Sequence, residues 1–146
     1  MLKGINPLLC GDLLRTLDQM GHGDQLLLVD RNYPAIASGK QVIHIAQTSI
    51  LNVTNAILSV FPLDTFISAP VERMEVEDDP QKITKVQESF VELVRDHQPT
   101  VTEFGVISRS AFYQRARSAF AVVHTLETAP YSCFILHKGV VNVPVN

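Results

Sequence analysis

The sequence predicts an α/β fold, a single three-layer α/β/α domain with a mostly parallel or mixed central sheet. Short apolar segments of strand length alternate with longer segments whose apolar residues recur at helical spacing. Two more strand-like segments follow near the C-terminus. The length of 146 residues fits one domain, and no repeat, low-complexity segment or linker divides residues 1–146.

The first third of the chain supplies one helix and two strands. Residues 12–20 carry leucine and methionine at helical spacing, and Gly21 follows as a natural C-terminal cap. Residues 25–30 are too short for a helix and too apolar for an exposed strand, which predicts a central strand covered on both faces. Residues 42–45 predict a second strand.

The middle of the chain predicts two helices around an extended segment. Thr48 and Ser49 can cap a helix that runs to about Phe61 and is ended by Pro62. Residues 70–77 alternate partly between apolar and polar side chains, as an extended segment does. Asp79-Pro80 predicts the start of a helix that runs to residue 97, because Asp caps free N–H groups and Pro is tolerated at the first helical position.

The last third predicts a strand over residues 102–107, a short helix over residues 108–116 and two closing strands over residues 120–124 and 133–137. This order of strands and helices is typical of a sheet covered on both faces. In such folds ligands bind beyond the carboxyl ends of the strands. We therefore expect the functional residues at those ends.

Composition excludes several classes of function. The chain has 12 Lys and Arg against 15 Asp and Glu, and this acidic balance argues against a general nucleic-acid binder. The N-terminus has no pattern of a signal peptide, and no apolar run is long enough for a membrane helix. Cys10 and Cys133 form no metal-ligand spacing, and we expect both to be reduced in a cytoplasmic protein, a single disulfide being the alternative.

His22 is the sharpest candidate for chemistry. Glycine on each side, at Gly21 and Gly23, leaves the imidazole open to a ligand, and a reference pKa near about 6.5 suits proton transfer. Asp30 ends the strand that follows, and the two side chains could face each other only if the loops fold back. The plainer alternative is that His22 is an ordinary loop residue.

Two further groups lie beside predicted strand ends. Arg109 begins a helix after a strand, where it can reach over the sheet edge, or it is simply solvated while the aromatic residues after it pack in the core. Tyr131 and Cys133 enter the last strand with a phenol and a small polar group, or merely begin that strand. No nucleophile elbow, phosphate loop or zinc-protease motif is present.

The other histidines share no spacing of metal ligands, so we expect no metal site. His44, His124 and His137 lie in strand-like segments and are interpreted as structural.

Several motifs, in order along the chain, resemble the RbsD/FucU family of fucose mutarotases and ribose pyranases. The motifs are Pro7-Leu-Leu, Met20-Gly-His-Gly-Asp24, Asp30, Pro34-Ala35, Arg109-x-Ala-Phe-Tyr-x-Arg-Ala116, Ala119-Phe-Ala-Val-Val123, Thr125-x-Glu127, Tyr131 and Lys138-Gly-Val140. Together they span nearly the whole chain. Arg109 resembles the fucose branch, since the ribose branch is expected to carry His there.

The resemblance implies a cofactor-free isomerase that interconverts the α and β anomers of L-fucose or a related pyranose. A base takes the proton of the anomeric hydroxyl, an acid protonates the ring oxygen, and the opened ring closes on its other face. By resemblance His22 is the principal acid and base, Asp30 orients it or holds a sugar hydroxyl, and Tyr131 bonds near the reacting centre. Arg109 binds sugar hydroxyls, and we expect Tyr33 and Cys133 to contribute to substrate binding.

The resemblance also implies a homo-oligomer, commonly a ring-like decamer, with sites completed by a neighbouring subunit. One position departs from the family, because Cys133 stands where Asn is expected, and a thiol is a weak partner for a sugar hydroxyl. Three alternatives therefore stay open: a sugar-binding protein with weak or no catalysis, a ribose pyranase-like activity, and an oligomer that binds no sugar.

Overall fold

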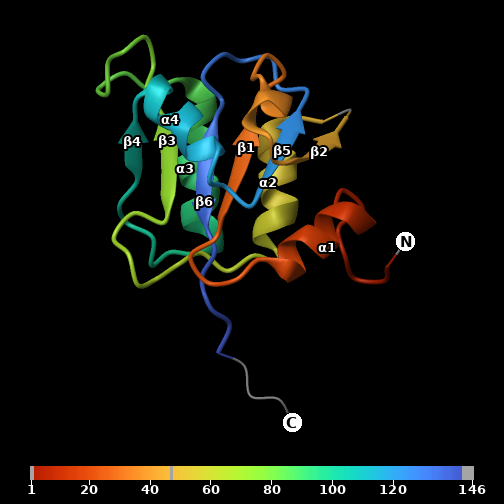
Figure 1. Ribbon diagram of the computed structural model, residues 1–146. Helices are drawn as coiled ribbons and strands as arrows, with labels where there is room; N and C mark the ends of the chain where they lie inside the picture. The colour runs from red at the N-terminus through yellow and green to blue at the C-terminus, as the bar shows by residue number, and fades with distance from the viewer. Residues whose placement is uncertain (1, 47, 143–146) are drawn as a thin grey trace.

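The computed structural model describes residues 2–46 and 48–142 and shows one six-stranded sheet with helices on both faces (Figure 1). The elements in chain order are α1 (Gly11–Gln19), β1 (Gln25–Val29), the 3-10 helix η1 (Ala35–Ser38), β2 (Gln41–Ile45), α2 (Ile50–Leu58), β3 (Val71–Met74), α3 (Lys85–His97), β4 (Gly105–Ile107), α4 (Arg109–Ala116), β5 (Ala121–Thr125) and β6 (Phe134–His137).

The sheet is mixed, with the strand order β2-β5-β1-β6-β3-β4. β1 and β2 run parallel to β5, and β3 runs parallel to β4. β6 runs antiparallel between β1 and β3 and joins the two parallel groups. The carboxyl ends of the parallel strands therefore lie at the same edge of the sheet as the amino end of β6, the upper edge in Figure 1.

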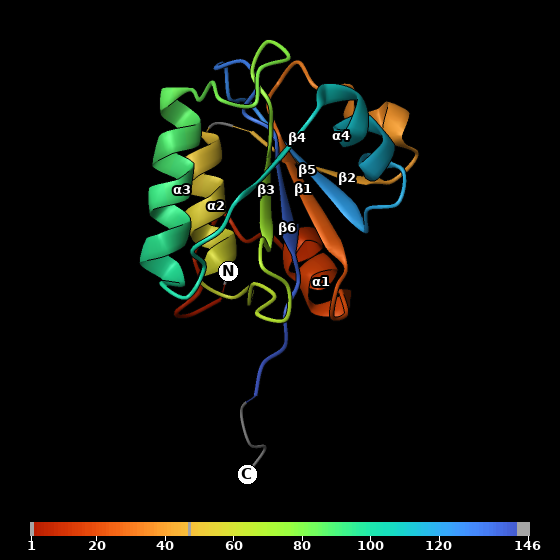
Figure 2. The same cartoon turned by 90° about the vertical axis from the view of Figure 1, so that its left-hand side faces the viewer.

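The helices form two outer layers (Figure 2). α2 and α3 lie against one face of the sheet, and the core on this face also takes in the apolar residues of α1. η1 and α4 cover the other face with a smaller core. The predicted three-layer α/β fold with a mixed sheet is confirmed. Among the described residues, no helix is both long and apolar enough to cross a bilayer.

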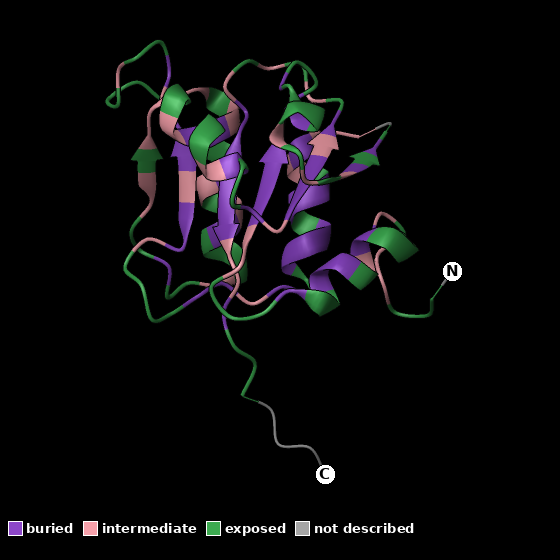
Figure 3. Ribbon diagram, in the orientation of Figure 1, coloured by how far each residue is buried: buried purple, intermediate pink, exposed green. Residues whose placement is uncertain are grey.

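Burial explains why β1 is central (Figure 3). Residues 26–29 are completely buried, with Leu26 and Leu28 in the core under α1–α3 and Leu27 and Val29 in the core under η1 and α4. Successive side chains of a strand point to opposite faces, so only an apolar run satisfies both cores. The predicted central strand is confirmed.

The predicted helix start at Asp79-Pro80 is wrong. Glu77 and Asp78 have φ angles of 50° and 59°, and Val76 pairs with Asp79, so residues 76–79 form a tight turn. Asp79 Oδ1 accepts the N–H of Gln81 at 2.9 Å, which uses the carboxylate within the turn. The helix begins instead at Lys85, after Thr84.

A capping box explains the later start of α3. The Thr84 hydroxyl accepts the N–H of Gln87 at 3.2 Å, and Gln87 Oε1 accepts the N–H of Thr84 at 3.2 Å. These two bonds satisfy donors that a helix start leaves free. The spacing of Thr and Gln three residues apart was a readable signal for this start.

The end of α1 also differs from the prediction. Met20 is extended, with φ −67° and ψ 135°, so Gly21 is not a left-handed cap. The left-handed residue is Gly23, with φ 84°, whose N–H donates to the carbonyl of Lys138 at 2.8 Å. This bond joins the loop that carries His22 to the chain that leaves β6.

Candidate functional site

A cleft lies at the upper edge of the sheet, where β1, β3, β6 and α4 meet. It encloses about 230 Å³ and gathers five of the residues predicted from the sequence, with Asn32, Met74, Tyr113 and Pro130 beside them. These five are Asp30, Tyr33, Arg109, Tyr131 and Cys133. The strand order accounts for the gathering, since each of the five follows or precedes a strand at this edge.

Asp30 is the most firmly held polar group of this cleft. Its side chain is buried, and Oδ1 accepts the backbone N–H groups of Asn32 at 3.0 Å and Tyr33 at 3.1 Å. The thiol of Cys133 donates to Oδ2 at 3.6 Å. Three donors therefore fix the carboxylate at the carboxyl end of β1, where it can accept hydrogen bonds from a ligand.

Cys133 is a neutral thiol in this setting. Burial raises its pKa well above the usual value, and the nearby charge of Asp30 raises it further. A nucleophilic cysteine needs the thiolate, so this position offers a weak S–H donor rather than a nucleophile. Cys10, the other cysteine, is also free and lies exposed near α1.

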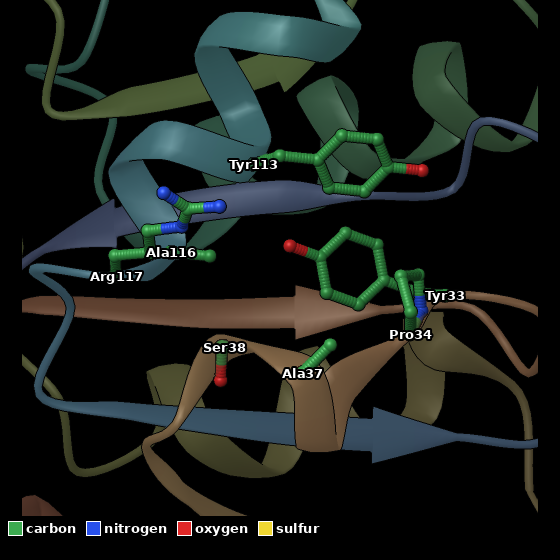
Figure 4. A pocket seen from close by; sticks show the side chains of 7 residues that line it. All are labelled: Tyr33, Pro34, Ala37, Ser38, Tyr113, Ala116 and Arg117. Atoms are coloured by element: carbon green, nitrogen blue, oxygen red, sulfur yellow. The ribbon is translucent and has the colours of Figure 1, made fainter.

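Tyr33 and Tyr113 form an aromatic wall on one side of the cleft. Their ring centroids lie 5.4 Å apart, and the wall also borders a second hollow of about 210 Å³ between η1 and α4 (Figure 4). Burial raises the pKa of Tyr33, so its hydroxyl stays protonated. Figure 4 shows that hydroxyl on the side of Arg117, away from Pro34.

Tyr131 has a strained backbone. Its φ of 61° lies in the left-handed region, which costs a non-glycine residue about 1–3 kcal/mol. The buried amide of Gln87 donates to the carbonyl of Tyr131 at 2.9 Å and to that of Met74 at 2.8 Å. Gln87 therefore holds the phenol-bearing residue, a role that the sequence analysis missed because the partner lies 44 positions away.

Arg109 is the first residue of α4 and lies exposed at the rim of the cleft. The Ser108 hydroxyl caps this helix by accepting the N–H of Ala111 at 3.1 Å. The guanidinium is thus available to a ligand above Asp30. Arg115, on the same helix, is instead bound to Glu72 at 2.9 Å.

His22 lies at the opposite edge of the sheet. It precedes β1, whereas Asp30 follows it, and the five residues of β1 alone span about 17 Å. Figure 1 shows the loop between α1 and β1 at the lower end of the sheet. Within one chain the loops do not fold back, so His22 and Asp30 do not meet.

The partner of His22 is Asp64, which the sequence analysis did not single out. His22 Nε2 lies 3.1 Å from Asp64 Oδ1, and the carboxylate side chain is 5% exposed against 43% for the imidazole. Asp64 Oδ1 also accepts the N–H of Phe66 at 2.9 Å. Phe66 packs edge-on against the imidazole at 5.1 Å and is otherwise exposed. A buried carboxylate thus orients an exposed imidazole beside an exposed aromatic ring.

The chain matches the model of the RbsD / FucU transport protein family over residues 3–141. It is 37% identical over 143 residues to an L-fucose mutarotase of Histophilus somni, which covers 98% of this chain and 99% of the relative.

Solved structures agree with this match. The fucose mutarotase of Streptococcus pneumoniae in complex with L-fucose is 34% identical, with a TM-score of 0.87 over 96% of this chain and 99% of that one. RbsD of Bacillus subtilis complexed with D-ribose is 19% identical, with a TM-score of 0.74 over 97% and 99%, and shows the shared fold. From its sequence match and its fold, this chain belongs to the RbsD/FucU family.

Proposed function

We propose that the protein is a monosaccharide mutarotase that interconverts the anomers of L-fucose or a related pyranose, and that two copies of the chain form each site. One copy supplies the cleft around Asp30, and the other supplies His22 with Asp64. The observation that carries the proposal is the separation of an oriented imidazole from the polar cleft by the length of β1. An acid–base pair that works on one sugar must come together, so a second chain has to bring His22.

The tautomer of His22 follows from its partner. An ionised carboxylate only accepts hydrogen bonds, so Nε2 facing Asp64 carries the proton and Nδ1 keeps a free lone pair. Nδ1 takes the proton of the anomeric hydroxyl, and Asp64 stabilises the imidazolium that results. The phenol of Tyr131 protonates the ring oxygen as the C–O bond breaks. Such acid–base assistance contributes roughly 10²–10⁴-fold.

The cleft supplies the groups that hold the sugar. Asp30 accepts hydrogen bonds from hydroxyls, and Arg109 donates to hydroxyl oxygens. The chain has no Trp, but Phe66 arrives with His22 and offers an exposed ring to the apolar face of the sugar. L-fucose is favoured as substrate because relatives that match nearly the whole chain carry the name L-fucose mutarotase.

The assembly is part of the proposal. A contact between the His22 edge of one chain and the Asp30 edge of the next joins two different surfaces, and repeated head-to-tail contacts of this kind form a ring when the rotation between neighbours closes. A ring-like homo-oligomer, decameric as the resemblance implies, meets this requirement. A cytoplasmic location fits the two free cysteines.

Saturation-transfer NMR tests the activity directly. The wild type should accelerate exchange between the α and β anomers of L-fucose, and His22→Ala should reduce that exchange to the uncatalysed rate. Exchange that is unchanged in the variant would remove His22 from the mechanism. If calorimetry shows that the wild type binds L-fucose but NMR shows no accelerated anomer exchange, the protein is a sugar-binding protein instead. Cys133 is the residue that favours this alternative.

A further inference from the structure

His44 and His124 form an imidazole pair on the face of the sheet that carries η1 and α4. They lie directly opposite each other in the parallel register of β2 and β5. Their Nδ1 atoms are 3.0 Å apart, and their rings are inclined by 82°. β2 is an edge strand and His44 is exposed, so this pair is open to solvent.

Hydrogen bonding defines where the protons of this pair lie. His124 Nε2 is 3.2 Å from the carbonyl oxygen of Arg31, which only accepts, so Nε2 carries the proton. Nδ1 of the neutral His124 ring therefore presents a lone pair toward His44. In the free protein His44 Nδ1–H donates to that lone pair, while His44 Nε2 faces solvent.

We propose that His44 and His124 form a chelating site for a late divalent transition metal, of the copper(II) or nickel(II) class, bound by both Nδ1 atoms. The cation replaces the hydrogen bond between the rings, which turn so that both Nδ1 lone pairs point at the cation instead of at each other. The proton of His44 moves from Nδ1 to Nε2, so both rings stay neutral. The only charge added to the pair is that of the cation. Imidazole nitrogen is a preferred ligand of these metals.

The spacing of the two nitrogens sets the metal class. With metal–nitrogen bonds of about 2.0–2.1 Å, a separation of 3.0 Å corresponds to an angle at the metal of about 95°. That angle is close to the right angle between neighbouring ligands in square-planar and tetragonal sites, which are typical of copper(II) and nickel(II). A tetrahedral zinc ion requires the nitrogens to move apart by about 0.3 Å.

The bond to Arg31 is the second supporting feature. Metal-binding histidines usually donate their other ring N–H to a carbonyl or carboxylate, which fixes the tautomer and the ring orientation. His124 already makes such a bond. Arg31 directly follows Asp30, so a cation at this pair also anchors the turn that holds the Asp30 carboxylate.

Solvent would complete the coordination. Over the described ranges 2–46 and 48–142, no group of three or more His, Cys, Asp or Glu side chains is placed to hold a metal ion. Two protein ligands leave the other positions to water, which predicts an exchangeable ion rather than a permanent one. Spacing along the sequence did not reveal the pair, since its members lie 80 positions apart.

Calorimetric titration with nickel(II) tests this site without reference to the mutarotase activity. The wild type should bind one ion per chain, and His44→Gln and His124→Gln should each weaken binding at least tenfold. His97→Gln is the matched control, because His97 is also exposed but bonds to Asn55 and not to a second imidazole. Equal affinity in all four proteins, or a loss that appears only in His97→Gln, would overturn the proposal.

Electron paramagnetic resonance with copper(II) counts the ligands. The wild type should show two equivalent imidazole nitrogens, and His44→Gln should show one. His44 is exposed on an edge strand, so His44→Gln should fold normally. A midpoint of thermal unfolding equal to that of the wild type, measured without metal, checks this. Nickel(II) should raise the midpoint of the wild type and of His97→Gln but not that of His44→Gln. A single nitrogen in the wild type would contradict chelation.

Discussion

At the scale of the residue, two aspartates are held by different partners. Asp30 is held by two backbone N–H groups and a thiol and faces a polar cleft, whereas Asp64 is held against an imidazole. From the sequence, Asp30 was expected either to orient His22 or to hold a sugar hydroxyl. The structure gives the contact with His22 to Asp64, and in the proposed mechanism Asp30 keeps the second role, to hold a sugar hydroxyl.

Motif order predicted which residues share the cleft, but contacts between distant loops were not predictable. Asp30, Arg109 and Tyr131 each stand at a strand end, and parallel strands bring such ends together. Asp64 lies 42 positions from His22 in a loop without a regular pattern. Only the folded chain shows that contact.

Asp64→Asn should reduce anomer exchange about 100-fold, because an amide cannot stabilise the imidazolium as a carboxylate does. The KM for L-fucose should change little, since the sugar is held by the Asp30 cleft. Saturation-transfer NMR over a range of sugar concentrations separates the two quantities. Asp12→Asn, an exposed change in α1, should leave exchange unchanged. Full activity in Asp64→Asn would show that the imidazole needs no carboxylate partner.

Cys133→Asn should raise the exchange rate by about tenfold, because the amide offers a sugar hydroxyl both a donor and an acceptor that the thiol provides only weakly. The same NMR assay measures the gain, with Cys10→Ser as the control. No gain would indicate that the bond from Cys133 to Asp30 already serves this site, or that position 133 does not face the sugar.

At the scale of the element, periodicity located the helices and strands, while side-chain hydrogen bonds decided where they begin. The apolar stripe of residues 83–94 predicted α3, yet its start lies at Lys85 because Thr84 and Gln87 form a capping box. Asp79-Pro80 carries an equally good local signal, but Asp79 is used in the preceding turn. Local patterns of equal strength compete, and tertiary contacts of Gln87 settle the choice.

Comparing Thr84→Ala with Gln87→Leu distinguishes the N-terminal cap of α3 from the hydrogen bond by which Gln87 holds Tyr131. Thr84→Ala should lower the free energy of unfolding by about 1 kcal/mol and leave kcat unchanged, since only the cap is lost. Gln87→Leu should cost about 3 kcal/mol, because the carbonyls of Met74 and Tyr131 lose their buried donor and the buried Arg73 loses an acceptor, and it should lower kcat by releasing Tyr131. Chemical denaturation and NMR exchange measure both. Equal kcat values in the two variants would contradict a role of Gln87 in holding Tyr131.

Glu72 joins β3 to α4 and β6. Its carboxylate accepts from Arg115 at 2.9 Å and from His137 at 2.7 Å. Burial alone raises the pKa of Glu72, but the hydrogen bond of His137 and the charge and hydrogen bonds of Arg115 outweigh it, so the pKa lies below the usual 4.5. A carboxylate whose pKa is lower in the folded than in the unfolded protein stabilises the fold at any pH above its unfolded-state pKa. This contribution is lost as the pH falls through its folded-state pKa.

Glu72→Gln should therefore lower the free energy of unfolding by about 2 kcal/mol at neutral pH. The difference from the wild type should shrink as the pH drops below 4.5, the usual glutamate value. Denaturation curves at several pH values check this, with the exposed change Glu103→Gln as the control. A difference that does not depend on pH would contradict an ionised Glu72 in the folded protein.

At the scale of the whole molecule, the sheet separates His22 with Asp64 from the cleft around Asp30. Every parallel strand places its carboxyl end at the edge that carries the cleft, and the loop before β1 must then lie at the other edge. In the structure the length of β1 separates His22 from the cleft, which is why the proposed site takes His22 from a second chain. The family resemblance implied a shared site from the sequence, and the direction and length of β1 support that proposal.

Complementation between two inactive variants tests this account most directly. His22→Ala and Arg109→Ala should each abolish accelerated exchange of L-fucose as separate assemblies. When the two chains are co-expressed in equal amounts and purified together, random pairing should give about a quarter of the sites an intact His22 from one chain and an intact Arg109 from the next. Saturation-transfer NMR should then show about a quarter of the wild-type rate. If each site lay within one chain, no mixed assembly would hold a complete site, and exchange at the uncatalysed rate would contradict the shared site.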